Sequence, residues 1–441
     1  MSTSETTSSR WTGRFNHNRR STLSQKLPDT GERSHRLLSW VLLVGIFLPP
    51  IQIFIFDTKF TPGRIVVLAF LVPALGILLR RGRNWVVSDF SAAAVMIWMI
   101  LSSILNGGYR PSVVAEALEF FGAYLIGRAF FAGRVRIQTF MQTFGIVTVI
   151  LVACALLDTL AGRAFTLETT AKLFPLPQFG SGSRFGWERA NSTFGHAELL
   201  GTFCVAATAI FLYSDRKRLF YSGVSIVGTA FSLSSGPWLG LVVVLSIFCY
   251  DRILKSYPWR WKVLVIILGG MLLGVLVISN NPIGWVIRHL TFNPQTGYWR
   301  VSQWDAALTL IGQSPMLGFG VIVHTGGQHI DLFINQSVDC VWLVEALRYG
   351  LPAVVLLLLT IFAPFWSAPG YSLRTDSYMA SMRTGFSLAV IAMGLIGLTV
   401  HFWDSPWIFF SLCMGIRASF AETNLSRDFR PKTVAMRRAP H

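Results

Sequence analysis

Residues 281–352 read NPIGWVIRHLTFNPQTGYWRVSQWDAALTLIGQSPMLGFGVIVHTGGQHIDLFINQSVDCVWLVEALRYGLP and form a polar stretch between strongly apolar ones. Its charged and titratable side chains include Arg288, His289, Arg300, Asp305, His324, His329, Asp331, Asp339, Glu345 and Arg348. Most of the remaining sequence has the composition of helices that face lipid. Polar chemistry inside a membrane protein is costly and marks functional sites. We therefore expect this stretch to carry the function and the rest to serve as its scaffold.

The composition is that of a polytopic helical membrane protein. Of the 441 residues, 52% are hydrophobic and 13% are charged, whereas soluble domains carry about 25% charged residues. The 15 Trp and 34 Phe are typical of lipid contact and of interfacial belts. The sequence predicts an all-α integral membrane domain over residues 37–418. We expect a disordered basic cytoplasmic tail at 1–36 and a second basic cytoplasmic tail at 419–441.

The net charge of +17 does not indicate nucleic-acid binding. The Lys and Arg residues lie in short clusters between apolar runs, where they fix topology and meet anionic lipid. The five cysteines show no CxxC or Cys/His spacing of the kind that binds metal. No GxxxxGK[ST] motif is present. We therefore expect membrane lipids as partners, and no nucleic acid, metal or cofactor.

Apolar runs of the length of a bilayer crossing predict about twelve transmembrane helices. The candidate spans are 37–56, 64–79, 86–105, 112–131, 138–160, 195–213, 219–234, 237–250, 262–279, 340–366, 384–402 and 406–418. The two short runs around residue 235 could instead be half-helices.

Basic clusters fix the expected orientation of these spans. They recur in the loops on one side, which the positive-inside rule makes cytoplasmic, together with both termini. The other side carries two long loops, at 161–194 and 280–339. Arginines retained in these outer loops indicate an anionic ligand, and snorkelling from helix ends is the alternative.

Residues 184–201, RFGWERANSTFGHAELLG, form one candidate anion site. Arg184 and Arg189 precede His196 at the mouth of a helix expected to start near Gly195. The free N–H groups and the dipole of such a helix favour an anion, and arginines bind phosphate through charge-assisted hydrogen bonds. The alternative is that both arginines are only solvated.

Residues 298–320 predict an amphipathic helix at the outer membrane surface, since Arg300, Trp304, Leu308 and Ile311 recur at helical spacing. The segment 315–320, PMLGFG, should end this helix. On periodicity alone, an interfacial helix without a catalytic part is the preferred interpretation.

Several of these segments together resemble the O-antigen ligase/polymerase superfamily. The resemblance rests on Arg300 with Trp304, on 315–320, on 339–350 and on the RANSTFGHAELLG segment, which is similar to the family's Arg-x-x-Gly-x-Phe segment. Asp339 with the following RYGLP at 348–352 looks more like exopolysaccharide repeat-unit polymerases than lipid A-core ligases. Specific motifs cover roughly residues 184–352 of the chain.

The resemblance implies a glycosyltransferase at the periplasmic face of the bacterial inner membrane. Its donor and acceptor would be glycans on undecaprenyl diphosphate, with a flippase and chain-length or export proteins as further partners. Arg184, Arg189, Arg288 and Arg300 would hold the diphosphate leaving group, and attack would invert the anomeric carbon without metal or nucleotide. A ligase that transfers glycan to lipid A-core is the nearest alternative. A transporter or flippase is another, although the inverted repeats typical of transporters are not evident.

Two departures from the family pattern bear on the site. Counting back from Gly350 to the family's usual histidine gives Asp339, and the short outer turn reads Ser234-Ser235-Gly236 without the family's arginine. Asp339 is therefore the predicted base, with its pKa raised by burial. It could equally cap the helix that follows.

Other polar residues have accessory roles in this prediction. His196, His324 and His329 could each supply the missing base, or could be ordinary surface histidines. Glu345 and Arg348 are spaced for an ion pair within one helix. Glu119 lies deep in a span and is expected to face the bundle interior.

Overall fold

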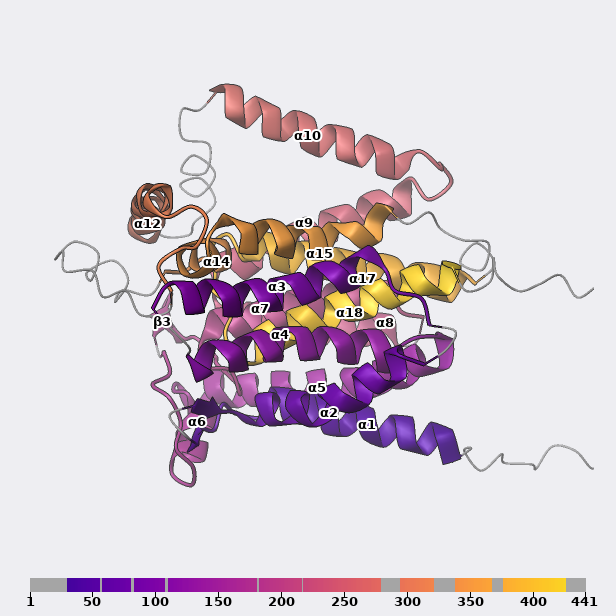
Figure 1. Cartoon of the computed structure of the whole chain (residues 1–441). Coiled ribbons are helices and arrows are strands. Elements are labelled where there is room, and N and C mark those ends of the chain that lie inside the picture. The colour runs from indigo at the N-terminus through magenta and orange to yellow at the C-terminus, as the bar shows by residue number, and fades with distance from the viewer. Residues whose placement is uncertain are drawn as a thin grey trace, which may run out of the picture.

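The computed structural model describes residues 30–55, 58–80, 83–107, 110–180, 182–215, 217–278, 294–320, 338–366 and 376–425. Within these ranges the chain folds into a bundle of α-helices with two short antiparallel hairpins (Figure 1). The all-α class predicted from the sequence is confirmed. Four of the described helices, α3, α5, α9 and α17, are long and apolar enough to cross a membrane, and α2, α7 and α15 are shorter apolar helices.

A helix occupies every stretch that the sequence predicted as a span. The first half of the bundle consists of α1 (Thr30–Phe47), α2 (Pro62–Leu78), α3 (Val87–Leu105), α4 (Pro111–Phe130), α5 (Arg134–Ala161) and α7 (Ala197–Leu212). The second half consists of α8 (Arg218–Ser232), α9 (Ser235–Ile253), α10 (Arg260–Ile278), α14 (Val341–Tyr349), α15 (Leu351–Trp366), α17 (Ser377–Ile396) and α18 (Ser405–Leu425).

The remaining elements lie in the connections between these helices. A hairpin of β1 (Ile53–Ile55) and β2 (Thr58–Phe60) follows α1. The predicted outer loop 161–194 contains the short helix α6 (Phe165–Ala171) and a hairpin of β3 (Ser183–Arg184) and β4 (Trp187–Glu188). The helix predicted within 298–320 is α12 (Pro294–Gln313).

Several predicted boundaries are wrong, each for a local physical reason. Helix α1 begins at Thr30 instead of residue 37, and it ends at Phe47 because Pro49 and Pro50 cannot continue it. Helix α18 runs to Leu425, past the predicted end at 418, because the side chains after that point are buried and Glu422 has a cationic partner.

The span predicted at 340–366 is two helices, α14 and α15. Gly350 separates them with a φ of 80°, in a region that disfavours residues with a Cβ. A Cβ there would lie 2.1 Å from the carbonyl oxygen of Met316. The break therefore depends on a backbone contact with a distant segment, which the apolar run could not show.

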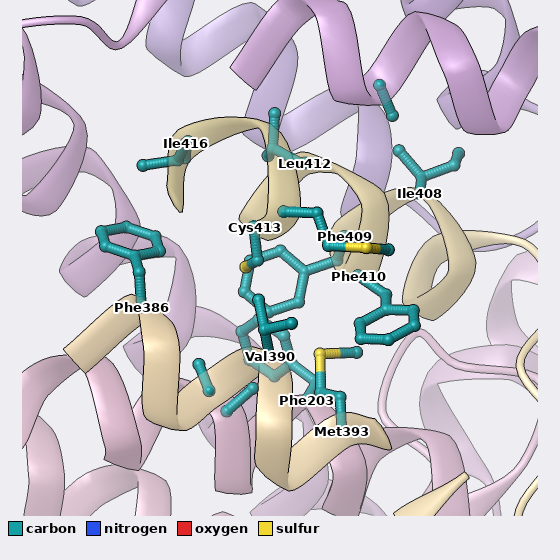
Figure 2. Close-up of a cluster of buried hydrophobic side chains, with 14 of the residues drawn as sticks. Phe203, Phe386, Val390, Met393, Ile408, Phe409, Phe410, Leu412, Cys413 and Ile416 are labelled. Carbon is teal, nitrogen blue, oxygen red and sulfur yellow. The ribbon is translucent and has the colours of Figure 1, made fainter. Parts of the chain in front are cut away.

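The core of the bundle lies where α7, α17 and α18 meet, and α4 packs against α18. Figure 2 shows Phe203 of α7 beside Val390 and Met393 of α17, and its ring contacts Phe409 of α18 at a centroid distance of 5.4 Å. Helices α4 and α18 approach closely at glycines. A Cβ at Gly415 would lie 2.0 Å from the carbonyl oxygen of Tyr124. Small residues at such crossings allow close backbone packing within membranes.

Several buried charges in the core are paired across helices. Arg128 of α4 pairs with Asp89 of α3 at 3.0 Å and also with Glu422 of α18. Arg64 of α2 pairs with Glu119 of α4 at 2.9 Å. Glu119 therefore faces the bundle interior, as the sequence predicted. A buried charge left alone would be strongly destabilising, so these pairs fix which helices are neighbours.

The connecting segments gather at two opposite ends of the bundle. At one end, Lys59 pairs with Asp404 at 3.0 Å and Asn106 donates to the carbonyl of Leu317 at 2.7 Å. At the other end, Arg134 pairs with Asp376 at 3.1 Å. These are the two groups of loops that the predicted spans place on opposite sides.

Two helices differ from the rest of the bundle (Figure 1). Helix α12 is seen end-on at the first end, so its axis runs across the axes of the bundle helices. Helix α10 stands apart from the bundle, with its apolar side chains exposed almost all round, Val265, Ile266 and Val277 among them. A helix that is apolar on every face suits a lipid environment.

The separation of the two ends generates a prediction of topology. In a variant lacking the natural cysteines, Gln313→Cys at the end of α12 and Asp215→Cys after α7 should lie on opposite sides of the membrane. Both positions are exposed. An impermeant maleimide added to intact cells should label the cysteine at 313 and reach the one at 215 only after permeabilisation, because basic loops stay inside. The reverse pattern would place the end of the bundle that carries α12 in the cytoplasm.

Candidate functional site: a cluster of arginines

Three of the predicted anion-binding residues come together at the first end of the bundle. Arg189 and Arg300 both contact one oxygen of Glu198, through their Nη2 atoms at 3.4 Å and 3.5 Å. Burial lowers the pKa of Arg184, and so do the neighbouring charges of Arg189 and Arg300, while Glu198 raises it. Two guanidiniums thus share a single carboxylate, and Arg184 donates to the same turn as Arg189, so the excess positive charge favours an anionic ligand.

The loop that carries Arg189 is fastened to the bundle by Asp158 near the end of α5. Its carboxylate is fully buried and accepts from the backbone N–H of Ser192 at 2.7 Å and of Asn191 at 3.2 Å. It also accepts from the backbone N–H and the hydroxyl of Thr166, both at 2.9 Å. A carboxylate with this many donors holds the segment before α7 in one conformation.

The short turn between α8 and α9 positions two of the arginines. Arg184 donates to the carbonyl of Leu233 at 3.0 Å, and Arg189 donates to the carbonyl of Ser232 at 3.3 Å and to the hydroxyl of Ser234 at 2.5 Å. The carbonyl groups of this turn orient arginines supplied by another loop. The two helices around residue 235 are separate elements, α8 and α9, joined by this turn.

Arg300 is the residue on which the case for an anion site depends. It lies on α12 with 3% of its surface exposed, and its buried Nε and Nη1 atoms have no hydrogen-bond partner among the described residues. Buried polar groups are almost always hydrogen-bonded, and a buried unpaired cation costs several kcal/mol. Such donors beside two other arginines are what an anionic ligand would satisfy.

Helix α12 is held in place by apolar contacts and one indole. Ala307, Leu310 and Ile311 pack against Leu343 and Leu347 of α14. Trp304 donates through Nε1 to the carbonyl of Leu398 at 3.3 Å. Leu308, predicted to share the packed face, is half-exposed, because the packed stripe runs through Ala307 and Ile311 instead.

The PMLGFG segment ends α12 and binds α14 through backbone hydrogen bonds. Its role in the described structure is to hold these two helices together. Phe319 and Gly320 donate through their backbone N–H groups to the carbonyls of Leu347 and Arg348, at 2.7 Å and 2.9 Å. Gly318 has a φ of 67°, and a Cβ there would lie 2.6 Å from the carbonyl oxygen of Leu347. Both conditions require glycine.

Asp339 is half-buried and directly precedes Cys340, the N-cap residue of α14. Its chain neighbours Val338 and Cys340 belong to the apolar cluster that joins α14 to α12, the helix that carries Arg300. The N-cap residue of α14 is Cys340, not Asp339. The base and cap interpretations of Asp339 both stay predictions.

The predicted ion pair between Glu345 and Arg348 is replaced by a pair between helices. Arg348 donates through Nη1 to Glu116 of α4 at 3.3 Å, and the hydroxyl of Tyr349 donates to the same carboxylate at 3.3 Å. Glu345 is buried on the same turn. Tertiary packing gave Arg348 a carboxylate from another helix, and these groups join α14 to α4.

His196 is a helix cap. Its Nδ1 accepts from the backbone N–H of Glu198 at 3.4 Å, which places the ring proton on Nε2. Burial lowers the pKa of His196; Arg189, Arg184 and Arg300 lower it further, and Glu198 opposes them. Of the other predicted site residues, Arg288, His324 and His329 lie outside the described residues.

The sequence prediction missed Glu198, His401 and Trp403. The Trp403 ring lies between His196 and His401, with centroid distances of 6.5 Å and 5.7 Å. The Nδ1 of His401 is buried without a hydrogen-bond partner. The segment HFWDSP at 401–406 is dense in aromatic and titratable residues, and that density was an available signal.

Backbone strain gathers at the same end. Of the five described non-glycine residues with positive φ, four are Phe185, Ser192, Leu233 and Asp404, in the loops at this end. Such conformations persist where the surrounding structure imposes them, and they cluster at functional sites.

Among the described residues, no group of three His, Cys, Asp or Glu side chains is placed to hold a metal ion. Comparison with known proteins found no family model that matches the chain and no match among curated proteins.

The two buried histidines predict how stability depends on pH. Burial lowers the pKa of His401 to about 3, with a smaller contribution from Arg348, and the pKa of His196 is also lowered. The unfolded chain therefore binds more protons below pH 6.5, so stability should fall as the pH drops from 7.5 to 5.5. The loss approaches about 1.4 kcal/mol per pH unit for His401 below pH 6.5, and His196 adds to it in the same direction.

The measurement is thermal unfolding of the detergent-purified protein at both pH values. A double variant with His196→Asn and His401→Asn should show a smaller loss of unfolding temperature between them, since Asn still caps α7. An unchanged loss in the double variant would mean that other groups produce the pH dependence.

Proposed function

We propose that the protein polymerises oligosaccharide repeat units carried on undecaprenyl diphosphate, as an inverting glycosyltransferase at the periplasmic face of the inner membrane. The observation that carries the proposal is the buried Arg300, whose Nε and Nη1 donors have no partner, beside Arg189 and Arg184. A diphosphate gains negative charge as it leaves, and preorganised donors aimed at such charge lower the barrier. Arg189 and Arg300 would exchange their long contacts with Glu198 for the phosphate oxygens.

Asp339 is the proposed base because it is half-buried at the start of α14, which packs against α12, the helix that carries Arg300. The acceptor hydroxyl would lose its proton to the Asp339 carboxylate while its oxygen bonds to the anomeric carbon of the donor. The bond from that carbon to the diphosphate oxygen would break, and the electron pair would leave with the lipid diphosphate. Attack opposite the leaving group inverts the anomeric carbon.

A ligase would use the same donor and the same leaving group and would differ only in its acceptor. A transporter or flippase would need to move the glycan without breaking this bond. Incubating the purified protein with lipid-linked repeat units, without ATP, separates the classes. Polymer with released lipid diphosphate supports the polymerase, and intact lipid-linked repeats with no transfer would contradict it.

Arg300→Lys should abolish most polymer formation although the positive charge remains. Lysine lacks the planar fork that binds two phosphate oxygens at once, and losing one such donor set lowers rates by about 10²-fold. The measurement is the initial rate of elongation by purified protein. Arg134→Lys, at an exposed ion pair at the other end of the bundle, is the matched control and should keep the wild-type rate. Full activity of Arg300→Lys would remove Arg300 from diphosphate binding.

Asp339→Asn should stop chain growth, because the amide keeps the shape of the side chain but cannot accept the proton. Asp339→His should retain part of the activity, since imidazole can act as a base. Polymer length in cells carrying each variant gives the result, with the amount of protein in the membrane checked by blot. Asp305→Asn, on an exposed part of α12, is the control. Normal polymer from Asp339→Asn would show that another group takes the proton.

A further inference from the structure

A cavity of about 860 Å³ lies at the end of the bundle opposite the arginine cluster. Its walls are the first turns of α5, the end of α7 and the starts of α8 and α17. The lining residues are Gln138, Met141, Gln142, Ile146, Phe211, Ser214, Asp215, Lys217, Tyr221 and Tyr378. Its volume is within the range of ligand sites, about 300–1,000 Å³, and it shares no residue with the proposed glycan site.

The lining changes from polar to apolar along the bundle. Gln138 lies near the start of α5, and Ile146 lies about two turns further into the bundle. Asp215 and Lys217 line the part of the cavity at the connection between α7 and α8, whereas Phe211 lies inside α7. An amphiphile with a polar head at the end of the bundle and an apolar chain along the helices matches this order.

The walls of the cavity are fixed by packing. The ring of Tyr221 stacks on Phe211 at a centroid distance of 5.2 Å and sits directly on Gly145, where a Cβ would lie 2.7 Å from the ring. Arg134 lies 5.3 Å from the centre of the Tyr378 ring. The side that carries Gln142 and Ile146 is exposed, so the cavity opens toward the surroundings of the bundle.

The charges at the polar end identify the head group. One carboxylate, Asp215, and one ammonium, Lys217, line the cavity, and neither pairs with another described residue. A head group that carries a phosphate and an ammonium can pair its phosphate with Lys217 and its ammonium with Asp215. Gln138 and Gln142 add uncharged donors and acceptors one helical turn apart, at positions where lipid tails alone would leave them unsatisfied.

We propose that this cavity binds one phosphatidylethanolamine molecule, with its phosphate at Lys217, its ammonium at Asp215 and an acyl chain along Ile146 and Phe211. Phosphatidylglycerol has the phosphate without the ammonium, so it should bind more weakly. Losing one charge-assisted hydrogen bond corresponds to about a tenfold weaker affinity.

The test uses the full chain, purified in detergent and incubated with equal amounts of phosphatidylethanolamine and phosphatidylglycerol, followed by native mass spectrometry. The wild type should retain one phosphatidylethanolamine in preference to phosphatidylglycerol. Gln142→Trp, at an exposed position, fills the cavity and should lower retention about tenfold. Asp215→Asn should remove the preference between the two lipids, and Lys217→Gln should weaken the binding of both.

Lys255→Gln is the charge-matched control, because Lys255 is exposed at the same end but does not line the cavity. It should bind as the wild type does. Equal retention of both lipids by the wild type, preference for phosphatidylglycerol, or undiminished retention by Gln142→Trp would each overturn the proposal. None of these outcomes depends on glycan transfer, so the proposal fails or stands separately from the proposed function.

Discussion

The cost of placing a charge in an apolar bundle governs this structure. The charge of Arg128 is neutralised by Asp89 and Glu422, and the charge of Arg64 is neutralised by Glu119. Each pair joins helices that are distant in sequence, so the same contacts that neutralise charge also choose helix neighbours. Breaking such a pair from one side would leave a buried charge uncompensated, which is strongly destabilising.

Arg300 differs from these two paired arginines and defines the candidate site. Its guanidinium is as buried as those of the paired arginines, yet it makes only a long contact with Glu198, which Arg189 shares. The loop and the turn around Arg300 are held by many specific hydrogen bonds. Asp158 gathers four donors to hold one loop, and the turn at 232–234 uses backbone carbonyls to aim two other arginines. We interpret these hydrogen bonds as holding the arginines in place for an anion that would complete the cluster.

The two ends of the bundle differ in the chemistry that they offer. The end with Arg184, Arg189 and Arg300 concentrates positive charge on α12 and on the loop before α7. The opposite end offers a wide cavity with one carboxylate, one ammonium and uncharged amides. A helical bundle that spans a bilayer presents its two ends to different surroundings, so two unrelated sites can coexist without sharing a residue.

The sequence alone determined the helical class, the position of nearly every helix and the convergence of arginines from two loops. The length of an apolar run and the position of basic clusters are properties of the local sequence, so they predict helices and their orientation without tertiary structure. Arg184, Arg189 and Arg300 were named because cations are rare and conspicuous in an apolar chain.

Tertiary structure decided what each polar group touches. Arg348 has a local partner at the right spacing in Glu345 and takes Glu116 of α4 instead. His196 caps α7, Gly350 splits an apolar run because Met316 approaches it, and Glu198 links two arginines that are far apart in sequence. Each outcome depends on which segments are neighbours in space, and an unmade polar contact in an apolar interior is costly enough to override the local pattern.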